Sequence, residues 1–173
     1  NANASDLLIE RRWQAEKWAV YLEKATALWP QWLFLLVGAS QERTYVRLIG
    51  EQLSSAARET VVNLAGEMNI GVYLALLKTA DLVVTIDSGP LHMAAALRRP
   101  TISLFGPVHP DHYAPLQGWR RVLYEPIYCS PCLHHADVPP CGGDNQCMKN
   151  IDVQSLLAST GEFIKEQQQE KGP

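Results

Sequence analysis

Six consecutive residues near the middle of the chain, 87–92, form a strand-to-helix junction suited to holding an anion. The segment LVVTIDSGPLHMAAAL (82–97) changes there from a β-branched apolar run to a run of small, helix-forming residues. The polar and small residues at this junction are Asp87, Ser88, Gly89 and His92. Pro90 fits the first turn of a helix, and the free N–H groups of that turn, with the positive end of the helix dipole, form an anion site. The same residues also suit an ordinary helix start, with Ser88 as N-cap and Asp87 as a strand-end residue.

Two more loops follow predicted strands and carry a glycine close to the strand end. They are residues 38–42, with Glu42, and residues 105–110. The candidate cleft residues of the second loop are Gly106, Pro107 and His109. In open α/β sheets, ligands bind outside the carboxyl ends of the strands, and glycine lets the backbone approach a ligand closely. We therefore expect the three loops to share one cleft.

The cysteines form a separate cluster in the sequence. Their spacing is C-x₂-C-x₈-C-x₅-C, and the residues are Cys129, Cys132, Cys141 and Cys147. In a reducing compartment this spacing is compatible with a structural tetrahedral zinc site, and in an oxidising one with two disulfides. Reduced, partly buried thiols are the third alternative. The spacing matches no established zinc module, so all three alternatives stay open.

The elements that must position these residues alternate between strands and helices. The predicted strands are 32–38, 60–66, 82–86, 101–106 and 120–125, and the predicted helices are 13–28, 41–57, 69–80, 90–97 and 152–168. Short apolar runs that alternate with helices predict βαβ units and a parallel sheet covered on both faces. We expect one Rossmann-like, three-layer α/β/α domain over 1–173, with a cysteine loop at 126–150 and a C-terminal helix at 151–168.

Composition narrows the class of protein. The chain has 173 residues, 47% of them hydrophobic, and a formal net charge of −3, which indicates a globular domain and disfavours a nucleic-acid partner. No apolar run is long enough to span a bilayer, and the opening residues do not form a signal peptide. We therefore expect a cytoplasmic protein. Because the chain opens inside a loop, we also expect it to be a fragment of a longer protein.

The long segment from LAGEMNIG through TIDSGPLHMAAAL to LFGPVHPDHYAPL (64–116) resembles glycosyltransferase family 9, the bacterial ADP-heptose:lipopolysaccharide heptosyltransferases and their relatives. ERRWQAEKW is similar to the family's Lys/Arg-x-Trp-Pro segment, NANASDLL to the loop before it, and GASQER to its Gly-x-x-x-Glu turn. The CSPC…C…CM segment is also similar to one found in many members. The chain departs from the family pattern at Gln14, Val108 and His109.

The resemblance implies the C-terminal half of a GT-B glycosyltransferase, the half that binds the nucleotide-sugar donor. It assigns Arg11 to the diphosphate, Glu42 to the ribose or base side, and Asp87, Ser88, Gly89 and His92 to the diphosphate and sugar end. The catalytic base, an aspartate, belongs to the other half, so we assign no catalytic residue to this chain. The implied donor is an ADP-sugar or another nucleotide-sugar, with no required cofactor, and the implied acceptor is a glycolipid that reaches the other half at the inner face of the bacterial inner membrane.

Two alternatives remain at this point. The chain is either half of a transferase or a nucleotide- or zinc-binding α/β interaction module without transferase chemistry, since a fold does not fix a function. A minor third reading is a UDP-sugar epimerase-like relative with the GT-B fold.

Overall fold

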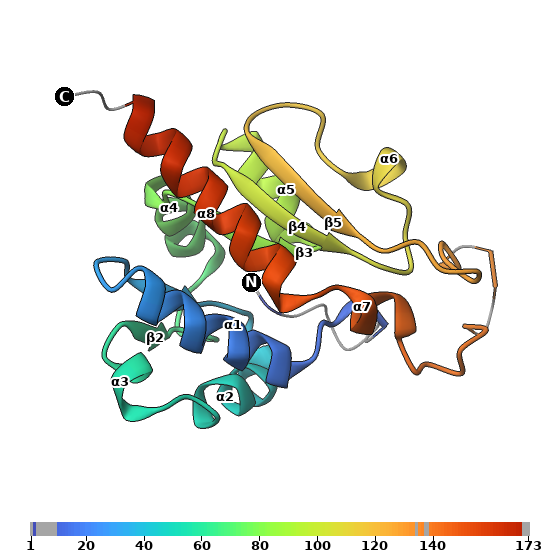
Figure 1. Cartoon of the computed structure of the whole chain (residues 1–173), viewed down its shortest axis with the longest axis horizontal. Helices are drawn as coiled ribbons and strands as arrows, with labels where there is room; N and C mark the ends of the chain where they lie inside the picture. Colours follow the sequence, from blue (N-terminus) through green and yellow to red (C-terminus); the bar gives the residue numbers. More distant parts are fainter. Residues whose placement is uncertain (1, 3–9, 134, 137–138, 171–173) are drawn as a thin grey trace.

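The computed structural model describes residues 2, 10–133, 135–136 and 139–170 (Figure 1). The strands are β1 (Phe34–Leu36), β2 (Val61–Asn63), β3 (Val83–Ile86), β4 (Thr101–Phe105) and β5 (Arg120–Tyr124). The helices are α1 (Ala15–Leu28), the 3₁₀ turn η2 (Ser40–Glu42), α2 (Arg43–Glu51), α3 (Ser55–Arg58), α4 (Ile70–Thr79), α5 (Gly89–Ala96), α6 (Pro110–Tyr113), α7 (Gln146–Asn150) and α8 (Val153–Glu170). The predicted opening loop lies, except for Ala2, outside the described residues.

All strand pairs are parallel, which confirms the predicted α/β class. They form two sheets, β1-β2 and β3-β4-β5, where the sequence predicts one. Phe34 pairs with Val61 in the first sheet, and Ile86 pairs with Leu104 in the second. Within the described ranges no hydrogen-bonded ladder joins β1 to β3, so the predicted single sheet is observed as two.

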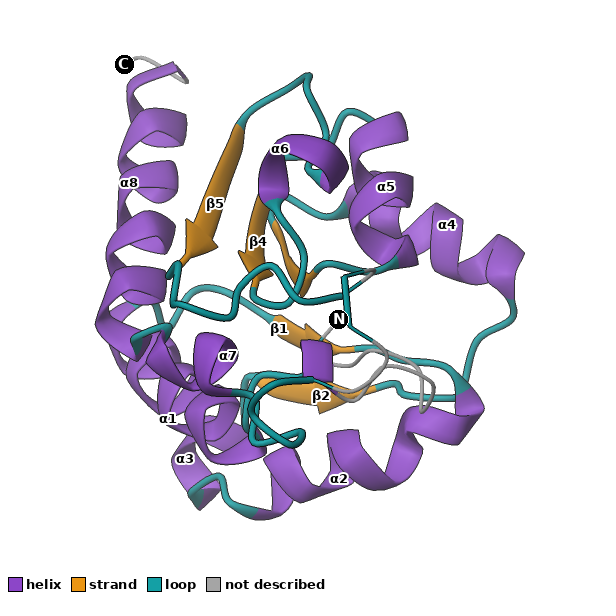
Figure 2. Cartoon of the chain, turned by 90° about the vertical axis from the view of Figure 1, so that its right-hand side faces the viewer, coloured by secondary structure: helices purple, strands orange, loops and turns teal. Residues whose placement is uncertain are grey.

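Helices cover both faces of the strands, as the predicted three-layer arrangement requires. Figure 2 shows α1 and α8 on one side of the strands and α4 and α5 on the other. Helix α1 packs against α8, and α5 packs against β3 and β4. Strand β4 is buried along its whole length, including the hydroxyl-bearing side chains of Thr101 and Ser103.

The predicted helix 41–57 is wrong as a single element. It is divided into η2, α2 and α3, because the chain turns at Gln52 and Leu53 before a new helix begins. Ser54 caps α3 by accepting a hydrogen bond from the Ala57 N–H at 3.2 Å, and Glu23 of α1 binds the backbone N–H of Ser54. A serine that can cap a helix gives the backbone an alternative to continuing the previous one.

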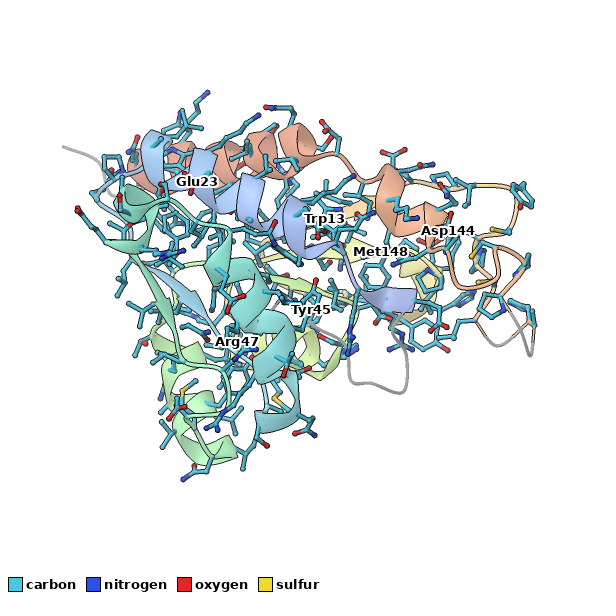
Figure 3. The ribbon with its side chains drawn as sticks, turned by 90° about the horizontal axis from the view of Figure 1, so that it is seen from below. Trp13, Glu23, Tyr45, Arg47, Asp144 and Met148 are labelled. Atoms are coloured by element: carbon cyan, nitrogen blue, oxygen red, sulfur yellow. The ribbon has the colours of Figure 1, made fainter. Side chains whose placement is uncertain are left out.

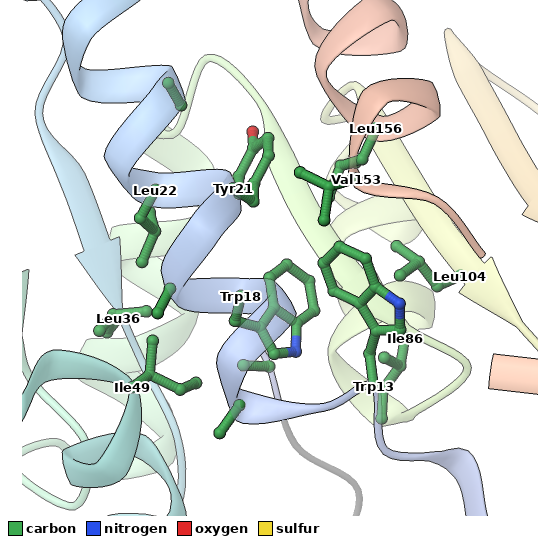
Figure 4. Packing of buried hydrophobic residues seen from close by; sticks show 14 of the residues in the cluster. Trp13, Trp18, Tyr21, Leu22, Leu36, Ile49, Ile86, Leu104, Val153 and Leu156 are labelled. Carbon is green, nitrogen blue, oxygen red and sulfur yellow. The ribbon is translucent and has the colours of Figure 1, made fainter. Parts of the chain in front are cut away.

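Trp18 of α1 and Trp13, which lies just before this helix, serve packing. Trp13 is fully buried and lies edge-on to Trp18, with 4.9 Å between ring centroids. Figure 4 shows both rings between α1 and the start of α8, near Val153 and Leu156. The main core therefore joins the first helix to the last one.

None of the helices in the described ranges is both long and apolar enough to cross a membrane.

Candidate functional site

Asp87 forms the centre of the site, directly after β3. It is 4% exposed, and one of its carboxylate oxygens lies 3.4 Å from Nη1 of Arg11. The same Nη1 lies 3.4 Å from the Asp87 carbonyl oxygen. A buried carboxylate needs such a partner, because an unpaired charge in the interior is strongly unfavourable. The structure thus brings together two predicted residues that are 76 positions apart in the sequence.

Ser88 precedes α5 but does not cap it. Its side chain makes no hydrogen bond to the helix N–H groups and donates instead to the Ile86 carbonyl at 3.2 Å. Thr85 Oγ1 lies 3.3 Å from Ser88 Oγ, so the hydroxyl is held toward the strand. Helix α5 begins at Gly89 with Pro90 in its first turn, as predicted. Within the described residues, no side chain binds the N–H groups of its first turn. Pro90 has no N–H and the Leu91 N–H donates to the Ser88 carbonyl at 3.0 Å, so the Gly89 N–H is the donor left for a ligand.

Gly89 and His92 are both exposed on α5. A Cβ atom built on Gly89 would meet nothing closer than Met93 Cε at 3.9 Å, so the packing of the protein does not demand a glycine there. A missing side chain at an exposed helix start keeps the space in front of the N–H groups open. His92 lies in the same turn and is accessible from solvent.

The segment that carries Arg11 is fastened to the far end of the chain. Trp13 Nε1 donates to the Ile151 carbonyl at 3.1 Å, and Lys17 Nζ donates to the same carbonyl at 2.8 Å. Tyr45 of α2 donates its hydroxyl proton to the Trp13 carbonyl. Figure 3 shows Trp13 at the start of α1, with Tyr45 on α2 to one side and Met148 on α7 to the other. These contacts, from α2 and from Ile151 between α7 and α8, fix the backbone beside Arg11.

Glu42 has a structural partner in its own loop. It is 8% exposed, and its Oε2 accepts a hydrogen bond from the Ala39 N–H at 2.7 Å. A Cβ atom on Gly38 would lie 2.9 Å from this oxygen, so the glycine makes room for the carboxylate. The described contacts do not join Glu42 to the Arg11–Asp87 pair, and its predicted role at the ribose remains a prediction.

The loop after β4 is held by the cysteine segment. The Pro107 carbonyl accepts hydrogen bonds from the N–H groups of Cys132 and Leu133 at 3.1 and 2.9 Å. A Cβ atom on Gly106 would lie 2.6 Å from Met148 Sδ, so this glycine is required by packing. His109 caps α6 through Nδ1, which accepts from the N–H of Asp111 at 3.3 Å. All three cleft-loop residues thus have structural partners, and no described contact tests their part in a cleft.

The cysteines are free thiols. Over the described ranges, which omit His134, no three His, Cys, Asp or Glu side chains are placed to hold a metal ion. Burial raises the pKa of the Cys147 thiol to about 11 and also raises the pKa of Cys132. Burial acts in the same direction on Cys141, but backbone N–H donors, including that of Asn145, outweigh it and lower the pKa.

Two side chains near the site are absent from the predicted set. Thr85 is fully buried at the end of β3 and orients Ser88. Tyr73 of α4 has its hydroxyl buried without a hydrogen-bond partner among the described residues. Burial and the negative charge of Glu42 raise the pKa of Tyr73 to about 12. In the sequence, Thr85 lies inside an apolar β-branched run and Tyr73 lies in an ordinary helix pattern. Neither pattern therefore indicates a functional residue.

Comparisons with known proteins show the family to which the chain belongs. Residues 2–141 match the model of glycosyltransferase family 9 (heptosyltransferase). The chain belongs to this family. Lipooligosaccharide heptosyltransferase 2 of Haemophilus influenzae is 40% identical to it over 88 residues, which are 51% of this chain and 25% of that protein. Lipopolysaccharide heptosyltransferase 2 of Escherichia coli is 35% identical over 89 residues, which are 51% of this chain and 26% of that protein.

Solved structures show that a longer part of the chain shares the family fold. The structure of E. coli ADP-heptose lps heptosyltransferase II is similar with a TM-score of 0.79 and 24% identity, over 95% of this chain and 45% of that one. The glycosyl transferase family 9 structure from Veillonella parvula has a TM-score of 0.77 and 20% identity, over 96% and 45%. The chain therefore spans less than half the length of these family 9 structures and has the fold of one of their parts.

Proposed function

We propose that this family 9 chain is the donor-binding half of a heptosyltransferase, and that it holds ADP-heptose for transfer to a lipopolysaccharide core. The observation that carries the proposal is the Arg11–Asp87 pair beside the uncapped start of α5. A cation held by a buried carboxylate, next to the backbone N–H of Gly89 at the positive end of a helix, suits a diphosphate. Two solved relatives, E. coli ADP-heptose lps heptosyltransferase II and E. coli heptosyltransferase WaaC with ADP, support this choice of donor.

The chemical role of this half is to stabilise the leaving group. When the bond between the sugar and the terminal phosphate oxygen breaks, negative charge develops on the nucleoside diphosphate. Donors that already point at that charge lower the barrier, because they need no reorganisation during the reaction. Arg11 would supply the cation, and the Gly89 N–H would supply a neutral donor. The base that activates the acceptor hydroxyl is expected in the other half.

Asp87 has a positioning role in this proposal. Facing a diphosphate alone, its charge would oppose binding, whereas paired with Arg11 at 3.4 Å it fixes the guanidinium. His92, exposed in the first turn of α5, lies where the sugar end of the donor would extend. Glu42 would receive the ribose hydroxyls only through its second oxygen, since Oε2 is bonded to the Ala39 N–H.

The acceptor would be a glycolipid bound by the other half. Such an acceptor is embedded in a membrane, so we propose that the full enzyme works as a peripheral protein at the inner face of the bacterial inner membrane. No transmembrane helix is needed for that location.

The test is a titration of the isotope-labelled chain with ADP, followed by NMR. We expect shifts at amides 87–92 and a dissociation constant on the order of 0.1–1 mM, because half a cleft buries only part of the ligand. A parallel titration with UDP distinguishes the epimerase-like alternative, which requires UDP to bind at least as tightly as ADP.

Arg121→Ala is the matched control for non-specific loss of positive charge. Arg121 lies near the amino end of β5 and is paired with Glu162 and Glu166 at 3.2 and 3.4 Å. Its removal should leave the ADP titration unchanged. Shifts that spread over other loops while amides 87–92 stay constant would refute the proposed donor site.

A further inference from the structure

His109 lies in the loop that connects β4 to α6, and its ring has packing partners on two sides. The ring centroid lies 5.4 Å from that of Tyr124 of β5, in an edge-on arrangement, and 5.9 Å from that of His112. The His109 side chain retains 36% exposure. The neighbouring rings thus fix the position of the imidazole, while part of it stays open to a ligand.

One nitrogen of the ring is used inside the protein. His109 Nδ1 accepts a hydrogen bond from the Asp111 N–H at 3.3 Å, which caps α6. The Asp111 carboxylate lies 3.7 Å from the same nitrogen, beyond hydrogen-bond distance, and is 83% exposed, so water screens its charge. In a neutral imidazole a nitrogen that accepts carries no proton, so the proton is on Nε2. Among the described contacts Nε2 has no partner, which leaves a hydrogen-bond donor in this loop.

The loop of His109 is the next loop along the sheet from the donor site. Strand β4 pairs with β3 in parallel, and Ile86 lies opposite Leu104 near the carboxyl end of the pair. Both chains leave the sheet at this edge, one toward Asp87 and the other toward His109. Adjacent strands lie about 4.8 Å apart, so the two loops begin about one strand spacing from each other.

The two loops also share a small piece of core. Leu91, in the first turn of α5, and Val108 are both buried and belong to one apolar cluster, against which Ala114 packs at the end of α6. His92 directly follows Leu91, and His109 directly follows Val108. The residue proposed for the sugar end of the donor and His109 are therefore attached to the same packed cluster.

The proposed donor runs along this edge of the strands in one direction. Its ribose belongs to Glu42, beyond β1, and its diphosphate to Gly89, beyond β3. Strand β4 pairs directly with β3, whereas a cavity of about 340 Å³ lies between β3 and β1 on the other side. A ligand that extends from Glu42 to Gly89 therefore brings its next group, the sugar, toward the loop after β4.

On the basis of the proposed function, we propose that His109 is a specificity residue for the donor sugar, and that its Nε2–H donates a hydrogen bond to a sugar hydroxyl. A hydroxyl oxygen accepts such a bond, and a neutral imidazole suits a neutral sugar. The ring is already held by Tyr124 and by the cap on Asp111, so it loses little freedom when it binds. His109 would thus make the chain bind an ADP-sugar more tightly than ADP.

The test compares ADP with ADP-heptose in calorimetric titrations of the chain and its variants. His109→Asn is the informative variant, because the asparagine oxygen still caps α6, whereas the shorter side chain has no group at the position of Nε2. One neutral hydrogen bond corresponds to a factor of about 3–10 in affinity. We therefore expect this variant to bind ADP-heptose about 3- to 10-fold more weakly and to bind ADP as the native chain does.

Two further variants separate the sugar contact from the fold. His109→Ala should lose the same affinity for ADP-heptose and should also lower Tm, because α6 loses its cap. His112→Asn is the matched control, since it removes an exposed imidazole whose centroid lies 5.9 Å away, and it should leave both titrations unchanged. A lower Tm of His109→Ala without weaker ADP-heptose binding would show that His109 serves only the fold.

An NMR titration gives a second readout. The shift differences between the ADP-heptose and ADP complexes should be largest in the 106–113 segment. Equal losses for both ligands in His109→Asn, no loss for ADP-heptose, or the same loss in His112→Asn would each overturn the sugar contact, while ADP shifts at amides 87–92 would leave the proposed function standing. If the native chain shows no ADP shifts at those amides, the proposed function fails, and the sugar contact of His109 fails with it.

Discussion

Replacing Asp87 and Arg11 singly and together tests how the donor site works. Arg11→Ala removes charge-assisted hydrogen bonds to the diphosphate, worth about 1.5–3 kcal/mol, so ADP should bind roughly 10- to 150-fold more weakly. Asp87→Ala keeps the cation but releases it from its 3.4 Å contact, and we expect a loss of roughly 5- to 30-fold, or about 1–2 kcal/mol.

In the double variant, the direction in which ADP affinity changes is the decisive result. Without Arg11, the buried Asp87 carboxylate faces the diphosphate without the guanidinium between them. Two unit charges about 8 Å apart repel by about 1 kcal/mol at an effective dielectric constant near 40. Asp87→Ala should therefore weaken ADP binding in the native chain but strengthen it about fivefold in the Arg11→Ala background.

Stability provides the second measurement. Removing one partner of a buried ion pair costs about 3–5 kcal/mol, and the Arg11 side chain retains 18% exposure, which lowers the expected cost of Asp87→Ala to about 2–3 kcal/mol. For a chain of this size, that is a decrease of roughly 4–12 °C in Tm. The calorimetric titrations are made at 15 °C, and a thermal melt of each variant checks that it is folded at that temperature. A loss of equal size in both backgrounds would show that Asp87 contacts ADP itself, and tighter binding by the single Asp87 variant would show that it only repels; either result refutes the positioning role.

Three further predictions concern single residues. Gly89→Ala should weaken ADP binding with little change in Tm. Gly106→Ala should instead lower Tm, because its new methyl group would lie 2.6 Å from a methionine sulfur. Thermal melts and ADP titrations of both variants distinguish the two effects. Cys147 has a pKa of about 11 against an ordinary 9.0, so it should react with iodoacetamide at pH 8 about 100-fold more slowly than an ordinary thiol, and Cys141 should react first. Peptide mass spectrometry after timed labelling measures the order. The reverse order would show that burial does not control reactivity. Asn69→Ala should cost about 1 kcal/mol of unfolding free energy in urea melts and leave ADP binding unchanged, since Asn69 caps α4 at 3.0 Å; no loss of stability would contradict the cap.

Local elements of the fold could be predicted from the sequence because local patterns determine them. The β-branched run before Asp87 and the proline after Gly89 specify a strand and a helix start within a few residues. The predicted helix 69–80 begins at Asn69, which caps α4 in the structure by accepting the Val72 N–H. The division of helix 41–57 was harder to predict, because it depends on Glu23 of another helix binding the Ser54 N–H.

The candidate site was predicted only in part, for a similar reason. Residue types and order place Arg11 and Asp87 in one family site, but nothing in the local pattern shows that they contact each other. Gly89 and Gly106 look alike in the sequence, since each follows a strand. The structure separates them, because Met148, which lies far along the chain, packs against one and nothing packs closely against the other.

The attachment of the Arg11 segment to the end of the chain determines when the site can form during synthesis. The Trp13 side chain bonds to the Ile151 carbonyl, 138 residues later. At translation rates of about 5–20 residues per second, that partner is made about 7–28 s after Trp13 itself. During this interval the nascent chain exposes Trp13 without the part of the core that will cover it. The backbone beside Arg11 therefore cannot be fixed in the donor site until the segment around Ile151 has been made.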